Sequence, residues 1–247
     1  MTPALMMQEG THKDAVGAIL FDVAASSQVG HDWFVPDFWR ARDALRIQSG
    51  GRGGVAIITT PIGECVLRHY RRGGLVARLL GDRYLWLGAD SSRPFREFRL
   101  LAEIARRGLP GPVVVAARYC RHGIAYTADL ITRRIAGART LAECLAAGQL
   151  DGELAGQVGE LLARFHRAGV WHADLNAHNV LVTAGGLYLI DFDRGRLRAP
   201  RLAWQQANLK RLRRSLIKLG AADESEAMFE QTVWQPLRQH YGQVLNP

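Results

Sequence analysis

Three polar side chains in the C-terminal half constrain this chain more than any other feature. Asp174 and Asn179 stand five residues apart, and Asp191 follows Asn179 by twelve residues. Two short β-like runs separate Asn179 from Asp191. Each residue alone means little, because loops rich in Asp, Asn and His commonly use these side chains to cap backbone groups. The joint pattern instead predicts one polar loop and one strand end that act together.

The spacing matches the two catalytic motifs of kinase-type phosphotransferases, H-R-D-L-x-x-x-N and D-F-G. Asp174 takes the place of the catalytic Asp and is expected to accept the proton of an attacking hydroxyl. Asn179 and Asp191 offer hard oxygen ligands that suit Mg²⁺ bound between protein and phosphate. His172 is expected to hold the loop in shape. A polar turn followed by an ordinary strand end is the alternative, and the joint register of the motifs favours catalysis.

A glycine cluster and an ion pair are expected to serve the nucleotide. Glycines let backbone N–H groups approach phosphates closely, so Gly51, Gly53 and Gly54 are candidate phosphate-binding residues, although a plain hairpin turn is the more frequent explanation of such a cluster. Kinases place a Lys on the third strand that pairs with a Glu on the next helix. Here these positions hold Arg68 and Glu97, and a surface salt bridge is the alternative for them.

Further cations follow Arg68 at the end of the same predicted strand. Arg71 and Arg72 precede two glycines. They are tentative substrate residues that would receive a negatively charged acceptor. A solvated, charged strand end explains them equally well.

The order of predicted elements indicates an α+β protein with two lobes. Residues 1–133 are expected to form a β-rich lobe with one helix, and residues 134–247 a helical lobe that carries the catalytic loop. The expected elements are strands at 55–60, 64–70, 113–119, 124–131, 179–183 and 187–190, and helices at 93–107, 141–147, 154–168 and 201–219. Thr140 and Glu143 form a candidate capping box at the start of the second helix.

Composition narrows the partners and the compartment. A net charge of +9 predicts attraction to an anionic partner, such as nucleic acid, phosphorylated lipid or acidic headgroups. The three cysteines are far apart, which suits a reducing compartment and argues against a zinc site. The first thirty residues lack a signal-peptide pattern, and no apolar run is long enough for a membrane span. We therefore expect a cytoplasmic protein whose membrane contact is peripheral.

The segment 201–219 has the pattern of a basic amphipathic helix. Its leucines at 202, 209, 212, 216 and 219 fall roughly on one side, and Lys and Arg residues occupy the rest. Such a helix can lie on an anionic membrane. It can also pack its leucines on its own domain and expose its charges, and the two arrangements can coexist.

At these residues the chain resembles the lipopolysaccharide kinase branch of the protein-kinase-like superfamily. The resemblance extends over about residues 50–195. Its carriers are Gly51-Arg52-Gly53, Val66-Leu67-Arg68-His69-Tyr70-Arg71-Arg72-Gly73-Gly74, Asp82-Arg83-Tyr84, Glu97-Phe98-Arg99-Leu100-Leu101, Trp171-His172-Ala173-Asp174-Leu175-Asn176-Ala177-His178-Asn179 and Leu189-Ile190-Asp191-Phe192-Asp193-Arg194-Gly195.

The resemblance implies a bilobal fold with an ATP cleft between the lobes, and it implies ATP and Mg²⁺ as cofactors. It implies phosphorylation of a hydroxyl of 3-deoxy-D-manno-octulosonic acid (Kdo), by likeness the 4-OH, on a lipid A precursor. The protein would act peripherally on the cytoplasmic side of the anionic inner membrane, and no nucleic-acid partner is expected. A heptose kinase of the same pathway and a nucleotide-binding scaffold without turnover are the alternatives.

Two departures from ordinary protein kinases argue against a protein substrate. Asn176 stands where Ser/Thr kinases have a Lys, two residues after the catalytic Asp, and the chain continues for only 54 residues after Asp193, without an A-P-E signature. Asp193 also replaces the Gly of D-F-G, which makes a flip of that motif less favourable and could supply another ligand near the metal. Arg68 in place of Lys keeps a permanent positive charge but changes its geometry.

Overall fold

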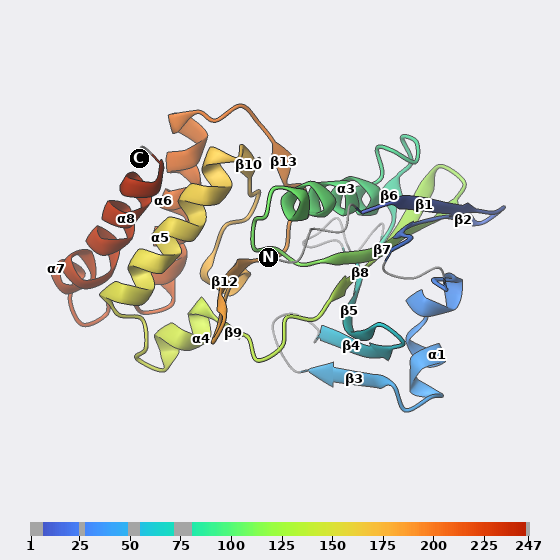
Figure 1. Cartoon of the computed structure of the whole chain (residues 1–247), viewed down its shortest axis with the longest axis horizontal. Helices are drawn as coiled ribbons and strands as arrows, with labels where there is room; N and C mark the ends of the chain where they lie inside the picture. The colour runs from blue at the N-terminus through green and yellow to red at the C-terminus, as the bar shows by residue number, and fades with distance from the viewer. Residues whose placement is uncertain (1–6, 25–27, 49–54, 72–80, 246–247) are drawn as a thin grey trace. The chain divides into compact units, whose positions relative to one another are not determined.

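The chain folds into two units, seen in a computed structural model that describes residues 7–24, 28–48, 55–71 and 81–245 (Figure 1). The first unit runs to Arg106 and also includes Pro112–Arg134, and the second comprises Arg107–Gly111 and Ile135–Pro247. The predicted α+β class, with an antiparallel sheet in the first unit and helices in the second, is confirmed. Among the described residues, none of the helices combines the length and the apolar character that crossing a bilayer requires.

The first unit is built on an eight-stranded antiparallel sheet. Its strands follow the spatial order β1-β2-β7-β8-β5-β4-β3, and the short β6 pairs with β8. The strands are β1 (Glu9–Lys13), β2 (Gly17–Asp22), β3 (Leu45–Gln48), β4 (Val55–Thr60), β5 (Gly63–His69), β6 (Tyr84–Leu85), β7 (Val114–His122) and β8 (Ala125–Arg133).

The β4–β5 hairpin carries Arg68 into the sheet. Gly63 has φ +105, a conformation that side chains with a Cβ rarely adopt, and it closes the turn with Thr60 as its register partner. The register then pairs Arg68 with Leu130 on β8. The strands expected at 55–60 and 64–70 are therefore present almost to the residue.

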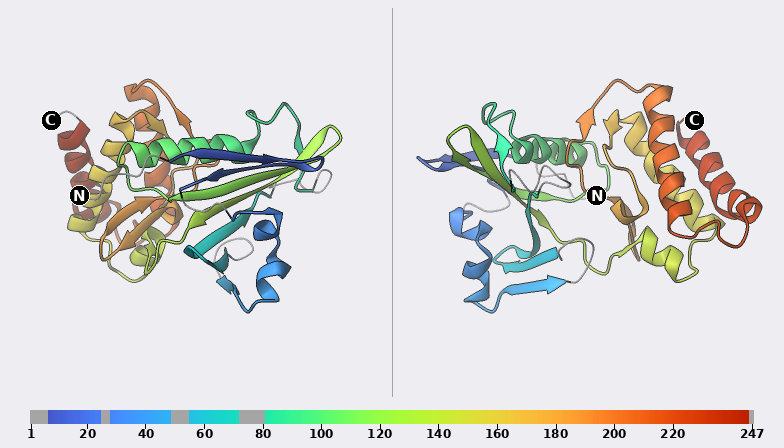
Figure 2. Two further views of the ribbon diagram at one scale, coloured as in Figure 1. Left: turned by 45° about the vertical axis from the view of Figure 1, so that its right-hand side comes forward. Right: turned by 180° about the vertical axis from the view of Figure 1, so that it is seen from behind.

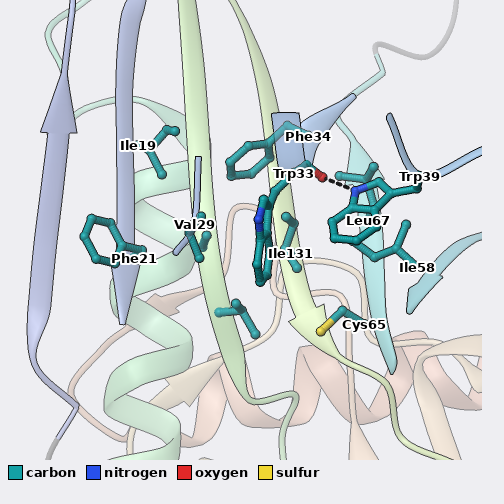
Figure 3. Close-up of a cluster of buried hydrophobic side chains, with 12 residues drawn as sticks. Ile19, Phe21, Val29, Trp33, Phe34, Trp39, Ile58, Cys65, Leu67 and Ile131 are labelled. Carbon is teal, nitrogen blue, oxygen red and sulfur yellow. Dashed lines mark hydrogen bonds between the residues drawn. The ribbon is translucent and has the colours of Figure 1, made fainter. Parts of the chain in front are cut away.

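Two short helical segments and the sheet enclose the core of the first unit. The 3₁₀ helix η1 (His31–Phe34) and α1 (Pro36–Arg40) supply aromatic side chains that pack on the strands (Figure 3). Trp39 packs edge-on to Trp33, and its indole Nε1 donates a hydrogen bond of 2.8 Å to the Trp33 carbonyl. This bond satisfies a polar group that burial would otherwise leave without a partner.

Helix α3 (Arg93–Arg106) packs on β7 and β8 and positions Glu97. Phe95, Phe98, Leu101 and Ile104 are all buried, as their helical spacing predicts. Gly108, with φ +65, ends the segment where the glycine and proline run predicts a stop. The helix therefore forms over nearly the predicted range, and it places Glu97 on its buried side.

The first 48 residues hold elements that no sequence pattern indicated. The β1–β2 hairpin turns at Asp14, whose carboxylate accepts hydrogen bonds of 2.8 Å from the N–H groups of Val16 and Gly17. Because β2 is buried along its whole length, it lacks the alternation that marks a half-buried strand. The strand therefore gave no periodic signal.

The second unit is helical, with short strands around one loop. It contains β9 (Arg139–Thr140), α4 (Leu141–Ala146), α5 (Gly152–Arg167), β10 (Val170–Trp171), η2 (Ala177–Asn179), β11 (Val180–Thr183), β12 (Gly186–Leu189), β13 (Arg196–Leu197), α6 (Leu202–Lys218), α7 (Glu226–Phe229), the π-helical turn η3 (Glu230–Trp234) and α8 (Gln235–Leu245). The predicted capping box is formed: Thr140 accepts from the Glu143 N–H, and the Glu143 carboxylate accepts from the Thr140 N–H.

Helix α6 packs its leucines on its own unit, beside α8 (Figure 2). Leu209, Leu212 and Leu216 are buried, whereas Leu202 and Leu219 are exposed, so the predicted apolar stripe is correct only in its middle. The packed arrangement is therefore present, and Lys210, Arg214 and Lys218 remain exposed on the same helix.

Helices α5 and α8 approach each other closely at a glycine. A Cβ on Gly159 would lie 2.2 Å from the carbonyl oxygen of Leu237, and one on Gly156 would lie 3.0 Å from the His240 ring. Real side-chain atoms cannot occupy the first position unless one of the helices moves. Gly159 therefore sets the separation of this helix pair.

Gly159→Ala should lower the free energy of unfolding by about 1–3 kcal/mol, because the added methyl group overpacks a backbone contact. Gly242→Ala in α8 is the matched control: nothing lies within 4 Å of its Cβ position, so the higher helix propensity of Ala should raise stability by up to about 1 kcal/mol. Urea unfolding of both variants measures the effect. Equal changes in the two variants would contradict the close approach.

Candidate active site

The loop 172–179 begins at the end of β10, directly after the buried helix α5. Gly169 turns the chain out of α5 with φ +72, and a Cβ there would lie 2.4 Å from the Arg198 carbonyl. Val170 and Trp171 then pair antiparallel with β13. Strand pairing and helix packing therefore fix the start of the loop from two sides.

His172 is buried and uses both ring nitrogens. Its Nε2 donates to the Ile190 carbonyl at 2.9 Å, and its Nδ1 accepts from the Asp174 N–H at 3.1 Å. These partners require a neutral ring with the proton on Nε2. Burial lowers the pKa of His172 below its ordinary value and keeps the ring neutral. The imidazole thereby joins the catalytic loop to the residue before Asp191, as expected of a loop-shaping side chain.

Asp174 presents an exposed carboxylate on a fixed backbone. Its main-chain carbonyl accepts from the side-chain amides of Asn176 and Asn179, each at 2.9 Å. The carboxylate has 58% side-chain exposure; Oδ1 lies 3.0 Å from an Arg211 nitrogen and Oδ2 lies 3.3 Å from the Asn176 amide. A carboxylate held in this way is open to an incoming hydroxyl, which general-base chemistry requires.

The β11–β12 hairpin brings Asn179 next to the segment that carries Asp191. Val180 pairs with Leu189, and the Ile190 N–H donates to the Asn179 carbonyl at 2.9 Å. Asp191 itself has φ +62, a left-handed conformation that is uncommon for residues other than glycine and is often found at functional sites.

The oxygen ligands around this hairpin suit a magnesium ion whose remaining coordination positions are filled by substrate phosphates. The Asn179 amide nitrogen donates to the Asp174 carbonyl, so its Oδ1 is the atom suited to coordination. Among the described residues, no group of three or more His, Cys, Asp or Glu side chains could hold a metal. Mg²⁺ typically takes one or two protein ligands and leaves the rest of its shell to water and phosphate, so Asn179 and Asp191 match its needs.

Phe192 fixes the strand end from the buried side. It stacks on Phe165 of α5, with ring centroids 5.7 Å apart, and meets the His172 ring edge-on at 5.1 Å. Because it fills this space, the D-F-D segment is anchored in the core of the second unit.

Three residues of helix α6, all missed by sequence reasoning, contact the loop 172–179. The buried Asn208 side chain pairs with the backbone of His172: its Nδ2 donates to the carbonyl at 2.9 Å and its Oδ1 accepts from the N–H at 3.4 Å. Ser215 accepts from the Ala177 N–H at 3.1 Å, and Arg211 reaches Asp174. These three residues share one helix face. An Asn at a core-facing position among leucines was the available signal.

In the first unit, Arg68 and Glu97 form an ion pair of 2.5 Å. The Glu97 side chain is only 3% exposed, so this is not an ordinary surface salt bridge. Tyr70, which sequence reasoning missed, donates to the same Glu97 oxygen at 2.6 Å. The Arg68 side chain keeps 31% exposure, although its Nε is buried.

The remaining predicted residues are less informative. Arg71 is exposed directly after β5, and neighbouring His69 bridges Asp129 and Asp82 at 2.7 and 2.6 Å. Hydrogen bonding to Asp129 raises the pKa of His69. Gly51, Gly53, Gly54 and Arg72 lie outside the described residues. The phosphate-binding role of the glycines and the acceptor role of both arginines stay predictions.

The second unit combines a neutral buried histidine, an exposed carboxylate, and an Asn and an Asp at the two ends of one hairpin. This arrangement matches the catalytic motifs of protein-kinase-like phosphotransferases. The α+β organisation of the two units agrees with that class. Comparison with known proteins narrows it. Residues 36–241 match the model of the lipopolysaccharide kinase (Kdo/WaaP) family, and the chain belongs to this family. It is accordingly an enzyme of the kinase type.

Curated relatives match over most of their length. A 3-deoxy-D-manno-octulosonic acid kinase of Stenotrophomonas maltophilia (strain R551-3) is 50% identical over 206 residues, covering 83% of this chain and 82% of the relative. One from Xylella fastidiosa (strain M12), with the same name, is 43% identical over 226 residues, covering 91% and 89%. The solved structure "WaaP in complex with acyl carrier protein" is 20% identical with a TM-score of 0.46, covering 81% of this chain and 84% of that chain.

Buried neutral histidines make stability depend on pH. Burial lowers the pKa of His166 to about 4, and its Nδ1 lies 2.8 Å from the Tyr241 hydroxyl. In the unfolded chain the ring has its ordinary pKa of about 6.5. As the pH falls, the unfolded state therefore binds the extra proton first. The free energy of unfolding, which is highest above pH ~6.5, should fall by about 3 kcal/mol as the pH falls towards 4.

Urea unfolding between pH 7.5 and 4.5 measures this slope. His166→Gln keeps a polar side chain but does not titrate, so its slope should be clearly smaller. His122→Gln removes an exposed imidazole at the end of β7 and serves as the control. A slope in His166→Gln equal to that of the wild type would show that another group causes the loss.

Proposed function

We propose that this protein is an ATP-dependent sugar kinase that phosphorylates a Kdo hydroxyl in lipopolysaccharide biosynthesis. The single observation that carries the proposal is the assembled constellation of Asp174, Asn179 and the Asp191 strand end in a chain of the Kdo/WaaP family. The names of relatives that are about 50% identical over most of the chain support Kdo as the sugar. By resemblance, the acceptor is the 4-OH of Kdo on a lipid A precursor.

The residues divide the reaction between them. The acceptor hydroxyl oxygen forms a bond to the γ-phosphorus of ATP, the bond from that phosphorus to the ADP oxygen breaks, and the hydroxyl proton passes to Asp174. His172 and Asn179 hold the backbone of Asp174 so that its carboxylate faces outwards. Mg²⁺ held by Asn179 and Asp191 would neutralise charge on the nucleotide phosphates.

Arg68 is proposed as the nucleotide anchor. It is permanently charged, and Glu97 and Tyr70 fix its guanidinium on the sheet. The glycines at 51, 53 and 54 lie outside the described residues, and they stay predicted phosphate-binding residues in this proposal. The observation that supports this part is the burial of Glu97, which costs free energy unless the carboxylate is paired.

Asp174→Asn should lower kcat at least roughly a hundredfold, because the amide cannot accept the hydroxyl proton. ADP release with Mg-ATP and a Kdo-lipid acceptor measures it, and Asp43→Asn, at an exposed position of the first unit, is a charge-matched control that leaves the proposed base and metal ligands in place. Near-normal turnover of Asp174→Asn would remove Asp174 from its role.

The same assay tests the acceptor. We expect ADP release to depend on the Kdo-lipid and not on heptose-bearing or protein acceptors. Turnover with the heptose acceptor alone would identify a heptose kinase. ATP binding without turnover on any acceptor would identify a nucleotide-binding scaffold.

We also propose that the enzyme works peripherally on the cytoplasmic face of the anionic inner membrane. The supporting observation is that α6 keeps Lys210, Arg214 and Lys218 exposed while the leucines in its middle are buried. Each basic side chain near an anionic surface contributes about 1 kcal/mol at low salt.

Binding to vesicles that contain phosphatidylglycerol should therefore weaken with salt and be absent on neutral vesicles. Lys210→Gln/Arg214→Gln/Lys218→Gln should weaken it by at least about tenfold. Arg40→Gln/Arg42→Gln/Arg46→Gln removes the same charge from the first unit and should retain most of the binding. Equal losses in both triple variants would point to net charge and contradict a specific role for α6.

A further inference from the structure

The catalytic loop lacks a cation at a position where phosphoryl transfer requires one. Charge accumulates on the transferred phosphoryl group, and Ser/Thr kinases place a Lys two residues after the catalytic Asp. Asn176 stands there in this chain. Its amide spans the Asp174 carbonyl at 2.9 Å and the Asp174 carboxylate at 3.3 Å, so it shapes the loop and brings no charge.

Arg211 brings a positive charge to the same place from a different element. It lies on α6, and its Nη1 is 3.0 Å from Oδ1 of Asp174. Its side chain is 46% exposed, so the guanidinium is not enclosed by the protein. A guanidinium has five N–H donors, and one bond to Asp174 leaves others for phosphate oxygens.

The contacts made by residues on either side of Arg211 hold this part of α6 against the catalytic loop. Asn208, three residues earlier, is buried and pairs with the His172 backbone at 2.9 and 3.4 Å. Ser215, four residues later, accepts from the Ala177 N–H at 3.1 Å. Residues three and four apart lie on one helix face, so both neighbours tie the face that carries Arg211 to the catalytic loop.

Stability does not explain the ion pair. Exposed pairs of this kind contribute about 0–1 kcal/mol, and both partners here are about half exposed. This small contribution, together with the contacts that Asn208 and Ser215 make to the loop, favours a role in the reaction.

We propose that Arg211 supplies the positive charge at the transferred phosphoryl group that Ser/Thr kinases obtain from the Lys at the position of Asn176. In the same arrangement Arg211 and the Asn176 amide hold the two oxygens of Asp174, so that the carboxylate is oriented towards the attacking hydroxyl. This inference rests on the proposed kinase function and adds a residue from α6 to the machinery.

Arg211→Gln should lower kcat with ATP and the Kdo-lipid acceptor about a hundredfold, the usual effect of removing one donor that stabilises developing charge. The melting temperature should stay within about 3 °C of the wild type, because the pair is exposed. Arg211→Lys should restore at least a tenth of the wild-type kcat. Arg201→Gln, at the exposed start of α6, removes the same charge and should keep wild-type kcat.

A charge transplant gives the sharper test. Asn176→Lys/Arg211→Gln places a cation where Ser/Thr kinases have it and should recover at least tenfold of the kcat lost in Arg211→Gln. Asn176→Lys alone controls for loss of the bond between the Asn176 side chain and the His178 N–H. A kcat of Arg211→Gln within twofold of the wild type would overturn the inference, as would a change confined to the KM of the acceptor.

These outcomes separate the inference from the proposed function. If the wild-type protein releases no ADP with the Kdo-lipid acceptor, the proposed function itself is wrong. Wild-type turnover together with an unaffected Arg211→Gln would leave the kinase standing and remove only Arg211.

Discussion

The buried imidazole of His172 is the interaction on which the candidate site depends. One ring nitrogen donates to Ile190 before Asp191, and the other accepts from the Asp174 N–H, so one neutral side chain sets the distance between two catalytic segments. Burial maintains this because it disfavours the charged ring, which would present a second donor to the Asp174 N–H. A protonated ring would lose that bond and strain the loop. The electrostatics of the core thereby fix the geometry of an exposed carboxylate.

Helix α6 also supports the catalytic loop, although its sequence indicated only a basic amphipathic helix. Its leucines pack on the second unit while Asn208 pairs with the His172 backbone, as a neighbouring strand would. The buried amide stays because both of its groups are satisfied, and an apolar replacement would leave the His172 N–H and carbonyl without partners. The helix therefore supports the loop and exposes cations at once, and the membrane and packing interpretations of its sequence are compatible.

Sequence patterns predicted the local structure well where apolar residues recur at a single helical or strand spacing. The β4–β5 hairpin, α3, α4 and α5 follow from turn glycines, apolar spacing and the Thr140 capping box. The pairing of Arg68 with Glu97 followed from motif order. The β1–β2 hairpin and the η1–α1 segment could not be predicted, because β2 is buried on both faces and the short helices are stabilised by tertiary packing around Trp33 and Trp39. Sequence reasoning also missed the support from Asn208, Arg211 and Tyr70, because it joins residues far apart in sequence, and only Asn208 among the leucines of α6 offered a signal.

Each unit holds its part of the kinase constellation through contacts internal to itself. In the first unit, Glu97 is buried and is held by Arg68 and Tyr70, so the proposed phosphate anchor is formed within one sheet and one helix. In the second, His172, Asn208 and the β11–β12 hairpin position Asp174, Asn179 and the Asp191 segment. Preorganisation of each half lowers the reorganisation needed when substrates bind, because side chains already in place lose little further entropy. The replacement of Lys by Arg at position 68 fits this arrangement: a planar guanidinium can be fixed by two oxygens and still offer donors to a phosphate, whereas an ammonium on a flexible stem depends more on the bound nucleotide for its position.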